Sequence, residues 1–168
     1  DKRADYIWSS DTDILAHGGQ RLIVDWNWAT GRAVVVTADA LFNSTHDSDN
    51  RMLCILRKYK LPALQLMTVV KSDYHDIKGM GAKTWMNVVD EIGSVDVSDF
   101  ANYLVSNVEK TEKGAVSLSR LDKAQILDSD FTNKLLVCVS NFKDALVYDC
   151  SANRVVSLGG KCAEEVNK

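Results

Sequence analysis

The chain has 168 residues, of which 46% are hydrophobic and 26% are charged, and its net charge is −3. This length suits one domain with one core, and the composition is ordinary for a soluble globular protein. No apolar run approaches the ~20 residues that a membrane span needs, and the first residues do not resemble a signal peptide. The negative charge argues mildly against a nucleic-acid partner, although an acidic metal site would itself add negative charge.

The first third of the chain reads as strands with short connections. An apolar run over residues 5–10 predicts a short strand. Two β-branched runs, Arg21–Trp26 and Arg32–Thr37, are separated by a short polar segment that ends in Gly31, which is a hairpin signal. Trp26 and Trp28 alternate along this hairpin, so we expect them to share a face; packing is the first interpretation, and stacking on a nucleobase is the alternative.

The middle of the chain reads as helices. Apolar residues at helical spacing predict helices around residues 52–56, 64–70, 85–92 and 100–108. Pro62 fits the first turn of the second of these helices. Asp96 or Ser98 is expected to cap the fourth.

The last third contains a polar segment, a helix and two extended runs. Lys110–Gly114 is the best candidate for a mobile loop, and Asp128–Phe142 is predicted to be a long helix. The runs Ala145–Asp149 and Arg154–Leu158 are expected to form a terminal extended pair. The expected fold class is therefore α/β, with a short sheet at the N-terminal end followed by a helical body in one domain.

None of the four cysteines, Cys54, Cys138, Cys150 and Cys162, forms a Cys-x-x-Cys pair. A zinc knuckle is therefore not expected. Cys54 and Cys138 lie in apolar runs, which favours buried thiols with a structural role. Thiols used in this way indicate a reducing intracellular compartment.

Two aspartates, Asp11 and Asp13, stand just beyond the first predicted strand. If strand geometry persists, both carboxylates emerge on one side, because alternate residues share a face. Oxygen ligands of this kind suit Mg²⁺ or Mn²⁺. The residues by themselves favour a plainer interpretation, in which Asp11 or Thr12 caps a helix that begins near Ile14.

A third acid, Asp73, follows an apolar helix and precedes a glycine-rich turn, Ile77–Lys83. Two glycines ahead of an amphipathic helix let the backbone approach a ligand closely, and helix N-terminal amides attract phosphate. Lys78 and Lys83 would supply positive charge for such a contact. An ordinary connector with a glycine hinge explains the same pattern equally well.

The order of these features resembles the superfamily of flap endonucleases and 5′ exonucleases, which serve DNA repair. That order is a strand ending in Ser-Asp-x-Asp, a hairpin, a helix ending in Ser-Asp-Tyr, and then Ile-Lys-Gly-Met-Gly. The resemblance covers essentially the whole chain and implies the C-terminal part of a PIN-like nuclease fold. It implies a helix–two-turn–helix DNA-binding element over about 64–93, and a closing helix and strands over about 128–160.

The resemblance also implies roles for single residues. The catalytic metal ligands would be Asp11, Asp13 and Asp73. The contacts to the DNA backbone would come from Lys78, Gly79, Met80, Gly81 and Lys83. A complete site of this family holds two Mg²⁺ or Mn²⁺ ions, usually with a monovalent cation in the Gly79–Gly81 turn. The implied substrate is branched or 5′-ended DNA, with RNA as a further candidate.

Two departures from the family pattern matter. The turn from Tyr74 to Ile77 is about one residue tighter than usual. The family's N-terminal acids would lie upstream, and the chain begins without an initiator Met, so we expect a piece of a longer protein. Three aspartates hold at most one of two ions, and we expect this chain to need its N-terminal half for activity.

Two other functions remain open at this point: a non-catalytic scaffold with the nuclease fold, and a helix–hairpin–helix module that binds nucleic acid. His17 and His46 have no spaced partner and are expected to be surface residues. His75, two residues from Asp73, could contact a substrate phosphate, although an ordinary loop histidine is the first interpretation. Trp85 is expected in the core.

Overall fold

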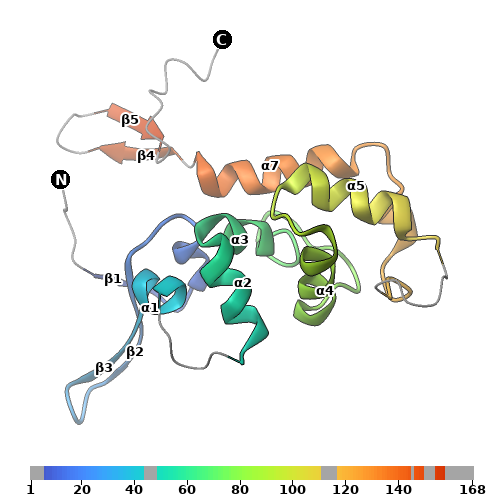
Figure 1. The fold of residues 1–168 in the computed structure, drawn as a ribbon. Coiled ribbons are helices and arrows are strands. Elements are labelled where there is room, and N and C mark those ends of the chain that lie inside the picture. Colours follow the sequence, from blue (N-terminus) through green and yellow to red (C-terminus); the bar gives the residue numbers. More distant parts are fainter. Residues whose placement is uncertain (1–5, 44–48, 111–116, 145, 150–153, 158–168) are drawn as a thin grey trace.

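In a computed structural model, the described residues are 6–43, 49–110, 117–144, 146–149 and 154–157. Within them the fold is mixed α/β, with a small sheet beside a helical body (Figure 1). This confirms the expected fold class at that level. None of the described helices is long and apolar enough to cross a membrane.

The sheet has three strands in the order β1 (Ile7–Trp8), β2 (Arg21–Asn27) and β3 (Arg32–Thr37). β1 runs parallel to β2, whereas β2 and β3 form an antiparallel hairpin with an irregularity between Ile23 and Asp25. The predicted hairpin is confirmed. The first strand is shorter than predicted, because the chain turns into a 3₁₀ helix, η1 (Thr12–Leu15), soon after Trp8.

Seven helices are described: α1 (Ala38–Asn43), α2 (Arg51–Tyr59), α3 (Leu61–Met67), α4 (Ala82–Ile92), α5 (Val97–Asn107), α6 (Lys123–Ile126) and α7 (Phe131–Lys143). Local signals explain several of their ends. Pro62 lies in the first turn of α3, as predicted. Asp96 is the N-cap of α5, and its carboxylate accepts hydrogen bonds from the amides of Ser98 and Asp99.

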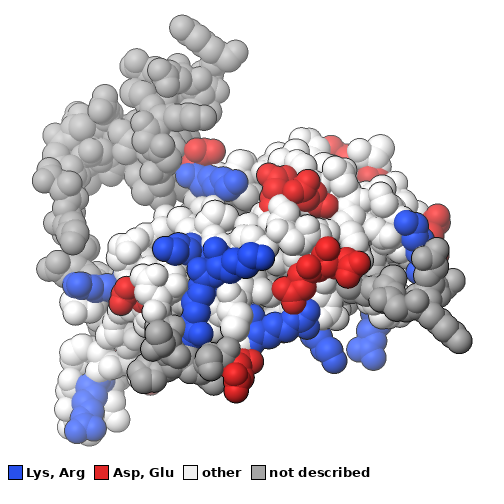
Figure 2. Space-filling model, in the orientation of Figure 1, with Lys and Arg blue, Asp and Glu red and all other residues white. Residues whose placement is uncertain are grey.

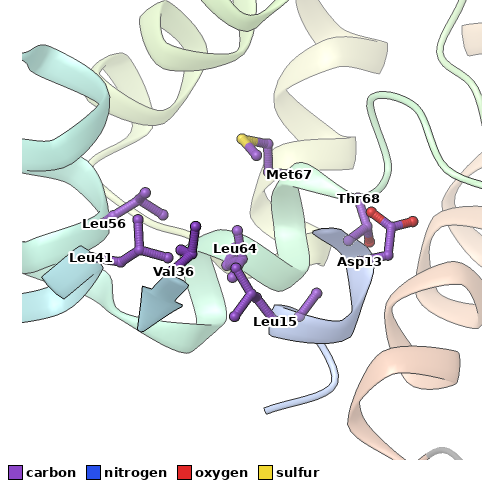
Figure 3. Close-up of a pocket in the computed structure, with 9 residues that line it drawn as sticks. Asp13, Leu15, Val36, Leu41, Leu56, Leu64, Met67 and Thr68 are labelled. Carbon is purple, nitrogen blue, oxygen red and sulfur yellow. The ribbon is translucent and has the colours of Figure 1, made fainter. Parts of the chain in front are cut away.

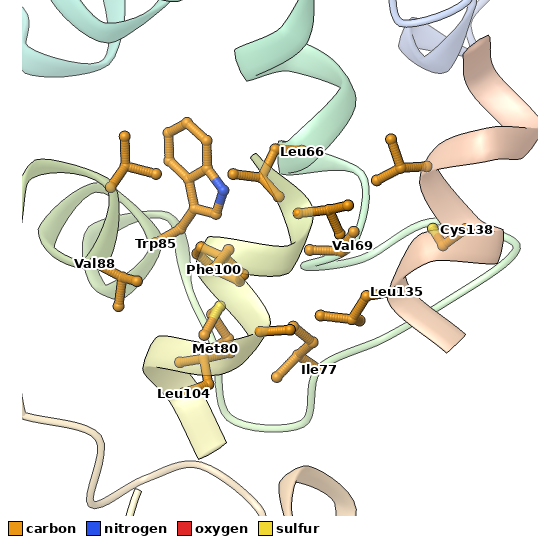
Figure 4. Packing of buried hydrophobic residues seen from close by; sticks show 14 of the residues in the cluster. Leu66, Val69, Ile77, Met80, Trp85, Val88, Phe100, Leu104, Leu135 and Cys138 are labelled. Atoms are coloured by element: carbon orange, nitrogen blue, oxygen red, sulfur yellow. The ribbon is translucent and has the colours of Figure 1, made fainter. Parts of the chain in front are cut away.

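The core joins α3, α4, α5 and α7 with the turns between them (Figure 4). Its largest fully buried side chains are Trp85, Phe100, Phe131 and Phe142. Burying side chains of this size stabilises the fold by roughly 2–3 kcal/mol each. The prediction that Trp85 belongs to the core is confirmed.

The two predicted buried thiols differ. Cys138 is buried in α7, as expected. Cys54 is exposed, so that prediction is wrong. The reason is its position on α2, where the neighbours Ile55 and Leu56 occupy the buried face instead.

The described chain ends in an antiparallel pair, β4 (Leu146–Asp149) and β5 (Arg154–Ser157). This confirms the predicted terminal extended pair, which lies beyond the end of α7 (Figure 1). The predicted mobile loop, Lys110–Gly114, lies almost entirely outside the described residues.

Candidate metal and nucleic-acid site

The first acidic segment is a capped 3₁₀ turn that follows β1. Asp11 is the N-cap of η1, and its Oδ1 accepts a hydrogen bond of 2.9 Å from the amide of Asp13. The amide of Asp11 itself donates to Ser9 Oγ at 3.0 Å. The capping interpretation is thus confirmed, whereas the expectation that strand geometry continues through Asp13 is wrong. The cap, rather than an extended backbone, determines how the two acids lie.

The second acidic segment is a tight turn that follows α3. Lys71 and Asp76 form an isolated antiparallel bridge, and the amide of Ser72 donates to the carbonyl of His75 at 2.8 Å. Asp73 lies between these contacts and is exposed. The short turn therefore presents the Asp73 carboxylate to solvent.

The fold brings the two acidic segments close enough to interact electrostatically. Partial burial raises the pKa of Asp13, the negative charges of Asp11 and Asp73 raise it further, and His17 opposes them. Like charges that share a site disfavour ionisation in this way. In the described part of the chain, however, no three His, Cys, Asp or Glu side chains converge tightly enough to hold a metal ion.

An aromatic contact from α7 connects the two segments. The ring of Phe142 lies 4.6 Å from that of His17 and 5.4 Å from that of Tyr74. His17 follows the first acidic segment and Tyr74 follows Asp73, so one buried side chain positions both. His17 is partly buried here, which corrects the expectation of a plain surface residue. The sequence offered no signal for this contact beyond an apolar residue late in a helix.

Polar contacts support the same arrangement. Gln65 is buried in α3, and its Nε2 donates to the carbonyl of Ala16 at 3.1 Å, which fixes α3 against the end of η1. The Cys138 sulfur lies 3.7 Å from Ser72 Oγ and so contacts the second acidic turn. Helices α3 and α7 therefore determine the separation of the acids.

Two hollows adjoin these acids. One, of about 290 Å³, is almost entirely apolar and has Asp13 and Thr68 as its polar lining (Figure 3). The other, of about 310 Å³, lies between the Asp73 turn and α7, and its lining combines polar and apolar surface: Tyr74, His75, Asp130, Asn133, Lys134, Val137, Cys138 and Asn141. Burial lowers the pKa of His75, so this histidine is held neutral near pH 7.

The glycine turn joins α3 to α4 and is held from inside the protein. Gly79 has φ +84°, and a Cβ at this position would lie 2.0 Å from the carbonyl oxygen of Arg120. The amide of Lys78 donates to Gln125 Oε1 at 2.9 Å, and its carbonyl accepts from the amide of Asp122 at 3.1 Å. The close approach that Gly79 permits is therefore to the protein's own backbone.

The remaining predicted backbone-contact residues divide into two kinds. Met80 is buried in the core, and its amide donates to the carbonyl of Ile77 at 3.0 Å. The side chain and the amide of Met80 are therefore both used internally, and its predicted contact with DNA stays a prediction. Gly81, Lys78 and Lys83 are exposed. Gly81 is the N-cap of α4 and offers no capping side chain, so no side chain caps the first amides of this helix.

Further positive charge lies over α2 and α3. Figure 2 shows Lys and Arg side chains gathered on this face, where α2 carries Arg57 and Lys58 in its last turn. Acidic side chains gather separately, over α4 and α5 in the same view. The net charge of −3 thus conceals separated regions of opposite sign.

Comparison with known proteins gives no family for this chain. No protein-family model matches it, and a search of the curated proteins found no match.

Proposed function

We propose that this chain carries part of the metal site and a DNA-backbone contact of a nuclease of the flap endonuclease or 5′ exonuclease type. The observation that carries the proposal is the approach of Asp13 to Asp73, which comes from a distant part of the sequence and whose charge, with that of Asp11, raises the pKa of Asp13. Carboxylates held near one another are unfavourable unless a cation neutralises them. On this proposal the fold is PIN-like, and α3, the glycine turn and α4 form its helix–two-turn–helix element.

The carboxylates are chemically suited to one hard divalent cation, which would have to draw Asp11, Asp13 and Asp73 closer together than they lie among the described residues. Three carboxylates, one of them partly buried, are the oxygen ligands that Mg²⁺ and Mn²⁺ prefer. Two such ions, when bound in a complete site, activate a water and stabilise the leaving oxygen. Asp11, Asp13 and Asp73 would hold one of them, and further acids from the N-terminal half would complete the site. We therefore expect this chain alone to hydrolyse DNA poorly.

The start of α4 would hold the substrate backbone. Its uncapped amides and the helix dipole favour an anion, and the exposed Lys78 and Lys83 add positive charge on either side of Gly81. A monovalent cation at the Gly79–Gly81 turn would bridge this backbone to phosphate. Contacts of this kind position a duplex without reading its sequence. Binding should therefore weaken steeply with salt and show little base preference, as suits an intracellular enzyme of nucleic acids.

The test is a calorimetric titration of the chain with Mn²⁺. We expect binding that the double variant Asp11→Asn/Asp13→Asn abolishes and that Asp73→Ala weakens. Asp25→Asn is the matched control, because it removes an exposed carboxylate from the hairpin. Unchanged binding in the double variant would exclude these aspartates as ligands. Mg²⁺-dependent cleavage of a 5′ flap by the purified chain, abolished by Asp73→Ala, would refute the need for a second half.

Two observations favour a non-catalytic alternative, in which the chain binds nucleic acid or serves as a scaffold. One oxygen of Asp11 is already engaged as a helix cap, and no tight metal cluster occurs among the described residues. A module of this kind would bind duplex DNA with strong salt dependence and show no affinity for Mn²⁺. The same titration therefore separates the two proposals.

A further inference from the structure

The two faces of the three-stranded sheet have different environments. Leu22 is fully buried and Val36 lines the apolar hollow, so this face packs on the helices. Successive side chains of a strand point to opposite faces. The register aligns Trp8 with Ile23 and Ile23 with Val35, which places these three side chains on the other face. That face points away from the helical body.

Aromatic side chains gather on this outer face. The rings of Trp8, Trp26 and Trp28 lie 5.7–6.4 Å apart, centroid to centroid. Trp8 is 60% exposed, Trp28 is 77% exposed and Tyr6 is 51% exposed. The guanidinium of Arg21 lies 5.5 Å from the centre of the Tyr6 ring. We call these five residues the aromatic face.

Packing alone does not account for this arrangement. The solvent-facing side of a sheet that covers a core normally carries polar residues, and a contiguous exposed apolar surface marks an interaction site. If these rings only stabilised the hairpin, burying them would contribute more to stability than leaving them exposed. The exposure of Trp8 and Trp28 instead leaves flat π surfaces available to a ligand.

The chemistry of the aromatic face fits unpaired bases. Successive bases stack on aromatic side chains without regard to sequence, and nearby cations attract the phosphates. Arg21 lies on the aromatic face and supplies that charge. The carboxylate of Asp25 belongs to the opposite face, because Asp25 pairs with Val34, the neighbour of Val35 in β3. The face therefore combines rings with a positive charge and keeps this negative charge away.

The aromatic face also lies close to the proposed metal site along the chain. Trp8 precedes Asp11 by three residues, so at most about 10 Å of extended backbone separates them. We infer that the aromatic face binds the unpaired strand of a nucleic-acid substrate by base stacking, on the side of the sheet opposite the hollow that Asp13 lines. This inference rests on the proposed nuclease function and adds single-stranded nucleic acid as the ligand of the hairpin.

The test uses the protein's own fluorescence. Trp85 is fully buried, and the other three of the four tryptophans belong to the aromatic face, so quenching by an oligonucleotide reports on that face. The probe is an oligothymidylate of about 12 nucleotides, titrated in EDTA so that no metal site takes part. We expect saturable quenching, with affinity reduced about tenfold in Trp28→Ala. Trp28→Phe, which keeps a ring, should lose less.

Two controls keep the test decisive. Val34→Ala removes a side chain of 55% exposure from the opposite face of the same hairpin and should leave affinity unchanged. An abasic oligomer with the same phosphates should fail to quench wild-type fluorescence, a readout that needs no variant to fold. Equal quenching by the abasic oligomer, or unchanged affinity in Trp28→Ala, would overturn the inference. So would sedimentation showing a dimer that Trp28→Ala converts to monomer, because the face would then join two copies.

The outcomes for the two proposals are separable. Quenching without Mn²⁺ binding would reject the metal site and support nucleic-acid binding by the aromatic face. Mn²⁺ binding that requires Asp11 and Asp13, without quenching, would support the metal site and reject nucleic-acid binding by the aromatic face.

Discussion

The two glycines of the Gly-x-Gly turn have different surroundings, and substitution can separate their roles. At Gly79 the backbone has φ +84°, and an added Cβ would meet the carbonyl oxygen of Arg120 at 2.0 Å. Gly81 has φ −109°, and nothing lies within 4 Å of its Cβ position. Gly93 provides a third case, with φ +65° and open space. Alanine therefore introduces both backbone strain and a collision at Gly79, neither at Gly81, and backbone strain alone at Gly93.

The expected costs follow from these geometries. The left-handed conformation costs a non-glycine residue about 1–2 kcal/mol, which is the full expected effect of Gly93→Ala. Gly79→Ala adds a collision with rigid backbone, and overpacking of this kind costs about 1–3 kcal/mol more. Gly81→Ala should change the free energy of unfolding by less than about 1 kcal/mol, because lost chain entropy in the unfolded state offsets the poorer cap.

Urea unfolding measures these costs, and duplex binding at low salt measures the function. We expect Gly79→Ala to be the least stable variant, and Gly81→Ala to retain stability while losing affinity for duplex DNA. Equal stability of Gly79→Ala and Gly81→Ala would refute the internal role assigned to Gly79. Unchanged duplex affinity in Gly81→Ala would remove the start of α4 from the proposed contact.

Two further predictions concern the acids. The pKa of Asp13 in the folded protein is raised above its ordinary value of 3.8. Ionising Asp13 therefore costs more in the folded than in the unfolded chain, and the free energy of unfolding falls as the pH rises from 3.8 through the folded pKa. Without metal, Asp13→Asn should therefore be more stable than wild type at pH 7 in urea unfolding and lose this advantage below pH ~3. A difference in stability that stays constant with pH would contradict the raised pKa of Asp13. Phe142→Ala should cost about 3–5 kcal/mol and weaken Mn²⁺ binding, whereas Leu136→Ala, an exposed position on the same helix, should do neither.

Local sequence determined most of the secondary structure. The strand Arg32–Thr37 follows from a continuous run of β-branched residues, and α5 begins where Asp96 can cap it. Both signals act between residues a few positions apart, and so they are readable without the rest of the chain. The Asp11 cap belongs to the same class, and it was the plainer of the two interpretations that the residues allowed.

Tertiary structure decided which surfaces meet. The sequence Gly79-Met80-Gly81 would be the same whether a phosphate or the Arg120 carbonyl lay against Gly79. Only the packing of residues 118–125 shows that the protein's own backbone fills the space beside Gly79. Likewise, the sequence does not distinguish Phe142 from the other apolar residues of its helix. Only the tertiary structure shows that its ring contacts both His17 and Tyr74. Contacts of this kind join residues far apart in sequence, and no local periodicity encodes them, because they depend on how complete helices and turns pack together.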